Sequence, residues 1–255
     1  MLFDTSSPGR RRGVQIIFAF LAILMGGGLV LFGIGSSSTQ GGGLLDNIGK
    51  GGTDVISQAQ KDASKAQDQL QANPKNVAAA ASYAKAEVTI ATGRSFDANG
   101  QATGKNSAND IATADAAWTQ YLALAPAKPD SSTATLYAAF YALPGVGKYD
   151  KAARALEAAL VTRTPTAGLY AQLAFDWLVA GDKTKYNEAR TKSLALSDND
   201  TRKTAIAKQL DDVEKQVDDY YKAQAKAAAA QKGSSSGGTA STTPKLPTLP
   251  SLAGN

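Results

Sequence analysis

The chain has 255 residues with 27 Lys and Arg against 22 Asp and Glu, and it contains neither cysteine nor histidine. The lack of cysteine excludes disulfides, thiolate metal sites and thiol nucleophiles, and the lack of histidine removes the commonest general base and metal ligand. From residue 54 to 232 there are 22 basic and 20 acidic residues, so this part has no electrostatic signature of nucleic-acid binding.

The first expected element is a transmembrane helix over residues 14–35, an uncharged and mostly apolar run. At 1.5 Å per residue such a helix is about 33 Å long, enough to cross a hydrocarbon core of roughly 30 Å. The lead over residues 1–13 ends in three arginines at 10–12, whereas the first basic residue after the run is Lys50. Because basic residues stay on the cytoplasmic side, we expect a single-pass cell-membrane protein with a cytoplasmic N-terminus and an extracytoplasmic soluble domain.

A cleaved signal peptide has the same basic start and apolar run, and it is the alternative interpretation of this segment. The run is longer than the roughly 7–15 residues of a signal-peptide core. Its best small-residue exit, over residues 33–36, is a weak cleavage site. We therefore favour an uncleaved anchor. Residues 36–52 are rich in Gly and Ser and predict a flexible linker.

Residues 53–232 are rich in helix-forming Ala, Lys, Glu, Gln and Leu, and they lack the alternating apolar pattern of strands. Proline, glycine and polar breakers divide them into helices that are expected over 53–72, 77–92, 111–125, 131–143, 148–163, 166–180, 184–197 and 199–231. A polar loop is expected over 96–110, and the last helix begins at an Asn-Asp cap. Residues 233–255 predict a disordered tail, whose Pro-rich end is alternatively a docking peptide.

Small residues recur within these helices at intervals of 38 and 37 residues, each followed by apolar positions in register. They are Ala114, Ala152 and Ala189. In the first copy, over residues 111–126, Trp118 and Leu122 follow the small residue and a proline ends the helix. This pattern resembles the second helix of a tetratricopeptide repeat, whose period is about 34 residues. The resemblance implies that the alanines allow close approach of two helices, while Trp118 and Leu122 pack against the next hairpin.

The fold that the resemblance implies is all-α: a transmembrane helix, then a tetratricopeptide-like α-solenoid of about three helical hairpins with a long C-terminal capping helix. The N-terminus is also similar to that of bacterial, actinobacterial-type tetratricopeptide proteins with a single anchor. An Ala-rich chain matches small-residue positions by chance, so an unrelated helical bundle is the alternative.

In this family the first helices of the hairpins line a concave peptide-binding groove. The positions that the resemblance assigns to it are Lys85, Val88, Thr135, Ala139, Ala171, Phe175 and Leu178. This lining is small and apolar apart from one lysine, which favours apolar segments of other proteins as ligands. We expect Phe175 and Leu178 to be exposed, and Trp177 between them to be buried.

Other charged motifs favour structural over chemical roles. The acidic residues at 211, 212, 214, 218 and 219 alternate with lysines at helical spacing, which favours a salt-bridged helix face over a metal site. The loop that begins at Asp97 faintly resembles a calcium loop but lacks its closing glutamate, so a β-turn is favoured. No phosphate-binding loop or nucleophile motif is present, and we expect no catalytic, cofactor or metal residue.

The sequence therefore predicts a non-enzymatic, membrane-anchored scaffold or adaptor that binds other proteins or peptides outside the cytoplasm and binds no nucleic acid. A close variant is an accessory or chaperone of protein secretion, with the translocon or its clients as partners. The alternative is a structural spacer of the cell envelope whose tail threads the wall. An enzyme is the third hypothesis.

Overall fold

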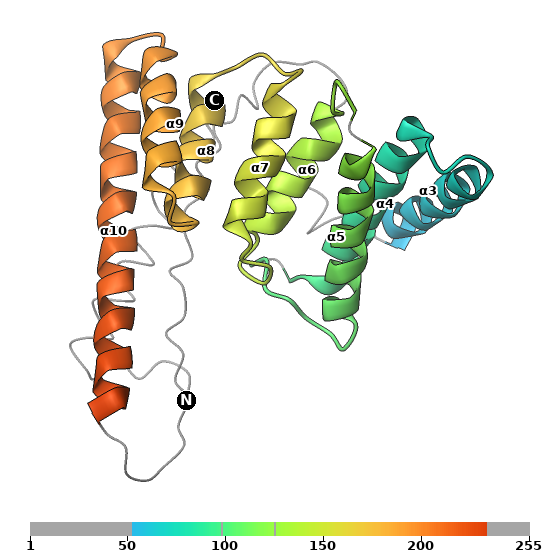
Figure 1. Cartoon of the computed structure of the whole chain (residues 1–255), viewed down its shortest axis with the longest axis horizontal. Coiled ribbons are helices and arrows are strands. Elements are labelled where there is room, and N and C mark those ends of the chain that lie inside the picture. Colours follow the sequence, from blue (N-terminus) through green and yellow to red (C-terminus); the bar gives the residue numbers. More distant parts are fainter. Residues whose placement is uncertain (1–52, 98, 125, 234–255) are drawn as a thin grey trace. The chain divides into compact units, whose positions relative to one another are not determined.

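The structure is a computed structural model that describes residues 53–233 apart from 98 and 125 (Figure 1). The described residues form eight helices and one isolated bridge between Phe96 and Ala102, which confirms the all-α class for this part. The helices are α3 (Thr53–Ala72), α4 (Val77–Ser95), α5 (Ser107–Ala123), α6 (Ser131–Ala142), α7 (Tyr149–Leu160), α8 (Ala167–Val179), α9 (Lys183–Ala195) and α10 (Asp200–Gly233).

The expected transmembrane helix over residues 14–35 lies outside the described residues, as do the lead, the linker and the tail from residue 234 onward. Of the helices within the described range, none has both the length and the apolar character needed to cross a membrane.

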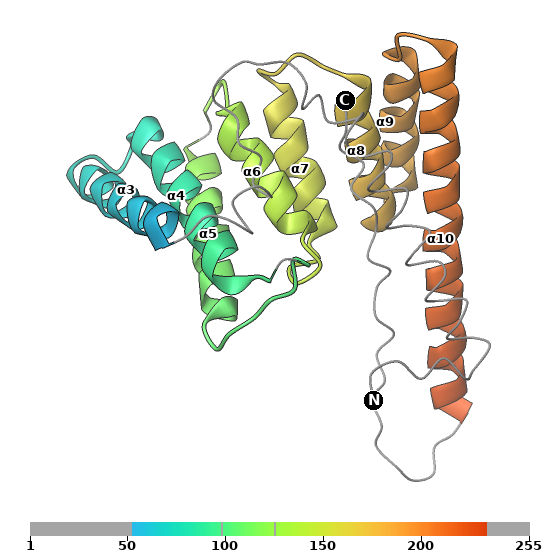
Figure 2. The ribbon, with the colours of Figure 1, turned by 180° about the vertical axis from the view of Figure 1, so that it is seen from behind.

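The described helices divide between two compact units. Residues 53–165 and 176–186 make up the α3–α7 unit, and residues 166–175 and 187–233 make up the α10 unit. In the α3–α7 unit, α3 packs on α4, α4 on α5 and α6 on α7. Helix α4 also packs on α6, two helices further along the chain. Figure 2 shows these helices from behind.

Two helix boundaries differ from the sequence-based expectation. Helix α4 does not end at Gly93 but continues to Ser95. A Cβ atom at Gly93 would come within 3.0 Å of Ile56 on α3, so this glycine allows two helices to approach rather than ending one. Helix α5 begins at Ser107 instead of 111, which shortens the preceding loop to residues 96–106.

Two helix starts carry asparagine caps. The side chain of Asn76 accepts a hydrogen bond from the backbone N–H of Ala79 at the start of α4. Asn199 caps α10, as expected, by accepting from the N–H of Arg202. Helix α8 ends at Val179 and is followed by Gly181, which has a positive φ of 85°. The N–H groups of Gly181 and Asp182 donate back into α8, which is the Schellman arrangement of a helix C-terminus.

The core of the α3–α7 unit is a cluster of aromatic side chains. Trp118 stacks on Tyr137 with ring centroids 4.7 Å apart, and Phe96 meets Phe140 edge to face at 6.0 Å. The hydroxyl of Tyr137 lies 2.9 Å from the carbonyl oxygen of Ala84 on α4 and 2.7 Å from that of Ala114 on α5. One side chain of α6 is therefore held between the two helices of the preceding pair.

The small residues of the repeat pattern are buried, as the close-approach interpretation expects. Ala114 and Ala152 have no exposed surface, and Ala189 has 3%. Leu122 is an exception to the expected packing, because 39% of its surface is exposed. It lies in the last turn of α5.

In the α10 unit one side of α10 is buried, and α10 is joined to α9. The buried residues of α10 follow helical spacing, at Ile206, Leu210, Val213 and Val217. Between α8 and α9, the Ser193 hydroxyl donates a hydrogen bond to the carbonyl oxygen of Ala167 at 2.6 Å. An ion pair of 2.6 Å joins Arg190 on α9 to Asp211 on α10.

Candidate binding surface

The structure brings three of the seven expected groove residues to the surface. Lys85 on α4 is exposed, and on α6 Ala139 is exposed and Thr135 is half-buried. We call the exposed side of α4 and α6 that carries these residues the α4–α6 face. The two helices pack on each other, so residues from both contribute to one surface.

The other four expected groove residues are buried. Val88 has no exposed surface, Ala171 and Phe175 have 4% each, and Leu178 has 1%. The expectation that Phe175 and Leu178 are exposed is therefore wrong, whereas the expected burial of Trp177, at 3%, is confirmed. Helix α8 is apolar on nearly every side, and a helix of this kind is enclosed by its neighbours rather than divided into an inner and an outer face.

Small and polar side chains surround Lys85, Thr135 and Ala139. One exposed or half-buried row follows each helix at a spacing of three or four residues: Ala78, Ser82, Lys85 and Thr89 on α4, and Ser132, Thr135, Ala139 and Ala142 on α6. Side chains of this size allow another chain to approach the helices closely. The Lys85 ammonium group and the Ser82 hydroxyl can donate hydrogen bonds to carbonyl oxygens of such a chain. The hydroxyls of the other three polar residues already donate within the protein, to the carbonyl oxygens of Lys85 and Ser131 and to the carboxylate of Asp130.

Asp130 is held in its charged form at the start of α6. Burial alone would raise the pKa of its carboxyl group, but hydrogen bonds from Thr133 and Ser132 and the charge of Lys85 outweigh burial and lower the pKa. The hydrogen bonds are 2.7 Å from the N–H of Thr133 and 2.8 Å from the hydroxyl of Ser132. Asp130 therefore caps α6 and also partly balances the positive charge of Lys85.

Arg163, just beyond α7, reaches the same end of α6. Its guanidinium group donates a hydrogen bond of 3.3 Å to the Thr135 hydroxyl, and the hydroxyl of Thr162 donates to the carbonyl oxygen of Pro129 at 3.2 Å. The α4–α6 face thus has a positively charged group from α4 and another from the end of α7. Arg163 was not among the expected groove residues, because the resemblance assigns groove positions only to the first helices of the hairpins and Arg163 follows a second helix.

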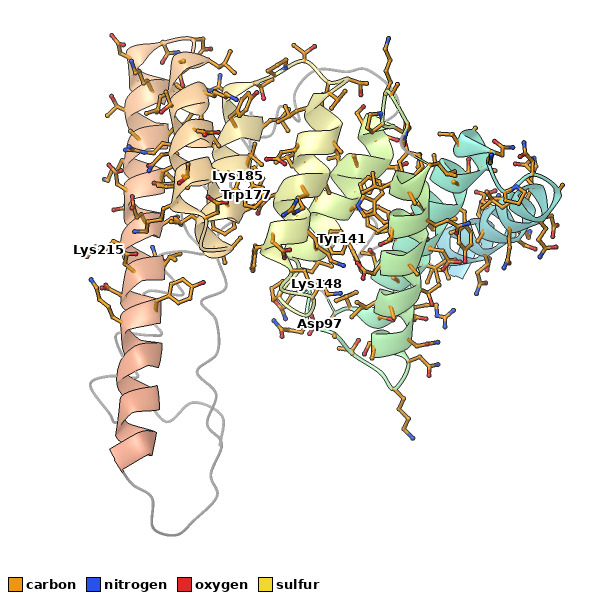
Figure 3. All side chains as sticks on the ribbon, viewed as in Figure 1. Asp97, Tyr141, Lys148, Trp177, Lys185 and Lys215 are labelled. Atoms are coloured by element: carbon orange, nitrogen blue, oxygen red, sulfur yellow. The ribbon has the colours of Figure 1, made fainter. Side chains whose placement is uncertain are left out.

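A polar cluster fastens α5, α6 and α7 together. Asp115 on α5 accepts hydrogen bonds from the Tyr141 hydroxyl at 2.7 Å and from the Lys151 ammonium group at 2.7 and 2.9 Å. Lys148 lies 3.6 Å from the same carboxylate (Tyr141 and Lys148 are labelled in Figure 3). Burial would raise the pKa of Asp115, but these donors and charges outweigh it and lower the pKa.

The electrostatics of this cluster favour a structural role. Burial, followed by the hydrogen bond to Asp115 and its charge, raises the pKa of Tyr141 far above its ordinary value. The hydroxyl therefore keeps its proton and acts as a donor. A tyrosine in this state does not serve as a general base at neutral pH.

A second cluster surrounds the buried indole of Trp177 at the end of α8. The ammonium group of Lys185 lies 3.9 Å from the ring centroid of Trp177 (Figure 3). The indole N–H donates a hydrogen bond of 3.2 Å to the carboxylate of Glu157 on α7, and Lys185 lies 3.8 Å from that carboxylate. These contacts hold the tip of the α8–α9 hairpin on α7 and satisfy the polar atom of a buried tryptophan.

The loop over residues 96–106 is a turn, as expected. The N–H of Gly100 donates to the carbonyl oxygen of Asp97 at 2.9 Å, and the Asp97 carboxylate accepts from the N–H groups of Asn99 and Gln101. Within the described ranges, no group of three or more acidic residues is arranged to hold a metal ion. The backbone N–H of Gly145, in the turn between α6 and α7, donates to the carbonyl oxygen of Gly100, so the two turns are docked on each other.

Comparison with known proteins adds no identification. The sequence matches no protein-family model, and no curated protein and no solved structure matches it.

Proposed function

We propose that this protein is a membrane-anchored helical-repeat scaffold that binds segments of other proteins outside the cytoplasm. The anchor is residues 14–35, and the repeat architecture is of the tetratricopeptide type. The interaction surface is the α4–α6 face, and no catalytic step is part of the proposal.

The observation that carries the proposal is the position of Tyr137 between two helices of the preceding pair. Its hydroxyl meets carbonyl oxygens of both α4 and α5, and α4 also packs on α6. Contact of each helical pair with the next is the feature from which repeat arrays build extended binding surfaces. Burial of Ala114 and Ala152 supports the same register.

The chemistry of the α4–α6 face supports an extended peptide segment as the ligand. Lys85 and Ser82 offer donors for backbone carbonyl oxygens, and the exposed alanines of the face leave room for the peptide. The burial of Phe175 and Leu178 removes the large apolar groups that favoured a strongly apolar ligand. Chains emerging from a secretion channel are one source of extended segments, so an accessory role in secretion is a close variant.

Site-specific photo-crosslinking in native membranes tests this proposal. A photoreactive residue at Ala139 should capture partner proteins, whereas the same residue at the exposed Ser64 of α3 should not, because Ser64 lies on a different helix from the proposed face. Translocon subunits or secretory chains among the adducts would favour the secretion variant. The same adducts from both positions would reject the α4–α6 face as the binding surface.

An envelope spacer is the second candidate, favoured by the length of α10. Its 34 residues span about 51 Å, longer than any other described helix. The spacer hypothesis expects cell-wall fragments to co-purify in mild detergent and expects no protein adducts at Ala139.

A further inference from the structure

The C-terminal part of α10 extends past the helices on which α10 packs. Among the residues of α10 whose burial is described, Val217 is the last buried one, and Tyr221 and Lys222 beyond it are exposed. The helix continues to Gly233. Figures 1 and 2 both show α10 as a single long helix that runs on past its buried part. We call residues 220–233 the α10 extension.

The sequence explains how a helix persists there. Between residues 222 and 232 the extension contains only Ala, Lys and Gln, which are among the best helix-forming residues. Lysines near the C-terminus also interact favourably with the negative end of the helix dipole. Helix formation in the extension therefore depends little on packing.

Charge is distributed unevenly between the extension and the rest of the domain. Residues 54–219 contain 19 basic and 20 acidic side chains, whereas residues 220–255 contain four lysines and no acid. In the packed part of α10 each exposed lysine has an acidic residue one turn away, as Lys215 has Asp211 and Asp219. Lys226 and Lys232 have none within a turn on either side. The extension is thus a positively charged arm on a nearly neutral domain.

We propose that the α10 extension docks on anionic lipid headgroups of the membrane in which the chain is anchored. This inference rests on the anchoring that is part of the proposed function. The 17 linker residues at 36–52 have a root-mean-square span of roughly 20–25 Å if they behave as a flexible Gly-rich chain. The linker therefore keeps the domain within reach of the bilayer surface, which favours lipid over a diffusing acidic protein as the occupant.

The composition of the extension also determines how it meets the membrane. Apart from Tyr220 and Tyr221 it has no large apolar side chain, so it lies on the headgroups instead of inserting into the hydrocarbon. Each lysine near an anionic leaflet strengthens association about fivefold, so Lys222, Lys226 and Lys232 together contribute on the order of 100-fold. Attraction of this kind falls steeply with salt.

A single fluorophore reports on the docking. Because the chain has no cysteine, Ala228→Cys in the full chain supplies one labelling site in the extension. The labelled protein is reconstituted into vesicles of phosphatidylcholine alone or mixed with phosphatidylglycerol, with a quencher on a fraction of the headgroups. We expect several-fold stronger quenching in the anionic vesicles, lost at about 1 M salt, where the screening length is about 3 Å.

Two triple variants distinguish lipid binding by the lysines of the extension from a general effect of positive charge anywhere on α10. Replacing Lys222, Lys226 and Lys232 with Gln should abolish the extra quenching. Replacing Lys203, Lys208 and Lys215, which are exposed in the packed part of α10, with Gln should leave it nearly unchanged. Equal quenching in neutral and anionic vesicles, or equal effects of the two variants, would overturn the inference. A fluorescence signal that changes when polyglutamate is added but does not respond to anionic lipid would also overturn the inference.

Flotation with neutral vesicles distinguishes this inference from the proposed anchoring. A chain that floats with phosphatidylcholine vesicles after an alkaline wash, yet shows no extra quenching in anionic ones, retains its anchor and refutes only the docking. A chain that fails to float with neutral vesicles lacks the anchor, and the docking inference falls with it.

Discussion

The hydroxyl of Tyr137 on α6 donates a hydrogen bond to the backbone carbonyl oxygen of Ala114 on α5, at 2.7 Å. Both residues have no exposed surface. A side chain of α6 thus reaches the backbone of α5, and the contact joins one helical pair to the next.

Tyr137→Phe should lower the free energy of unfolding by about 1 kcal/mol, because it removes one buried hydrogen bond while keeping the ring. Chemical denaturation of the purified chain in mild detergent measures the change. Tyr170→Phe is the matched control, since Tyr170 is half-buried and its ring lies under Lys192. A larger loss in the control would show that the Tyr137 hydroxyl does not join the helical pairs.

Trp177→Ala and Leu178→Ser should both unfold or strongly destabilise the protein. Both side chains are at least 97% buried, and loss of a buried tryptophan typically costs about 3–5 kcal/mol. Circular dichroism of the two variants during thermal unfolding is the measurement. Lys85→Ala, on an exposed residue, should melt like the original protein. A Leu178→Ser variant of normal stability would restore the idea of an open groove along α8.

Asp115→Asn should cost about 1 kcal/mol at neutral pH, because the carboxylate is partly exposed and its ion pairs are screened. The pKa of Asp115 is lowered from its ordinary value of 3.8, so its contribution is complete above that value and is lost as pH falls through the folded-state pKa. Unfolding curves between pH 2 and 5 should therefore converge for the two proteins at the acidic end. Parallel curves throughout would exclude a charged role for Asp115.

Glu87→Gln should raise the free energy of unfolding at neutral pH, in contrast to Asp115→Asn, which lowers it. Burial raises the pKa of Glu87 above its ordinary value of 4.5, and a nearby Asp110 adds to the effect. The protonated carboxyl group of Glu87 therefore stabilises the folded state at pH values below 4.5. This stabilisation is lost as the pH rises through the folded-state pKa of Glu87. A glutamine keeps the hydrogen-bonding shape without the charge. Denaturation midpoints at pH 4 and pH 7 measure the difference, and a destabilised variant at pH 7 would contradict the prediction.

A reporter that is active only outside the cytoplasm should be active when fused after Lys232, because in the proposed topology the arginines at 10–12 keep the N-terminus in the cytoplasm. Replacing the three arginines with glutamates should scramble the orientation. Protease treatment of spheroplasts gives an independent measurement, in which the domain is degraded. A protected domain and an inactive fusion would reject the proposed topology.

Local chemistry in the sequence was sufficient for the presence of the described helices and for most of their ends. Helix-forming composition, prolines, the cap at Asn199 and Gly181 act within a few residues of their own position, so they can be recognised without knowing the fold. The burial of Trp177 and of the recurring alanines was also predictable, because those residues belong to a helical pattern that repeats along the chain.

Only the tertiary structure decided which faces are open and which groups meet. Helix α8 is apolar on most sides, so its sequence could not show that Phe175 and Leu178 are enclosed. Asp115 meets Lys151 across 36 positions of the chain, and Gly93 accommodates Ile56 of another helix instead of ending its own. Exposure and pairing depend on what packs against a residue, and these partners come from distant parts of the chain that local patterns do not specify.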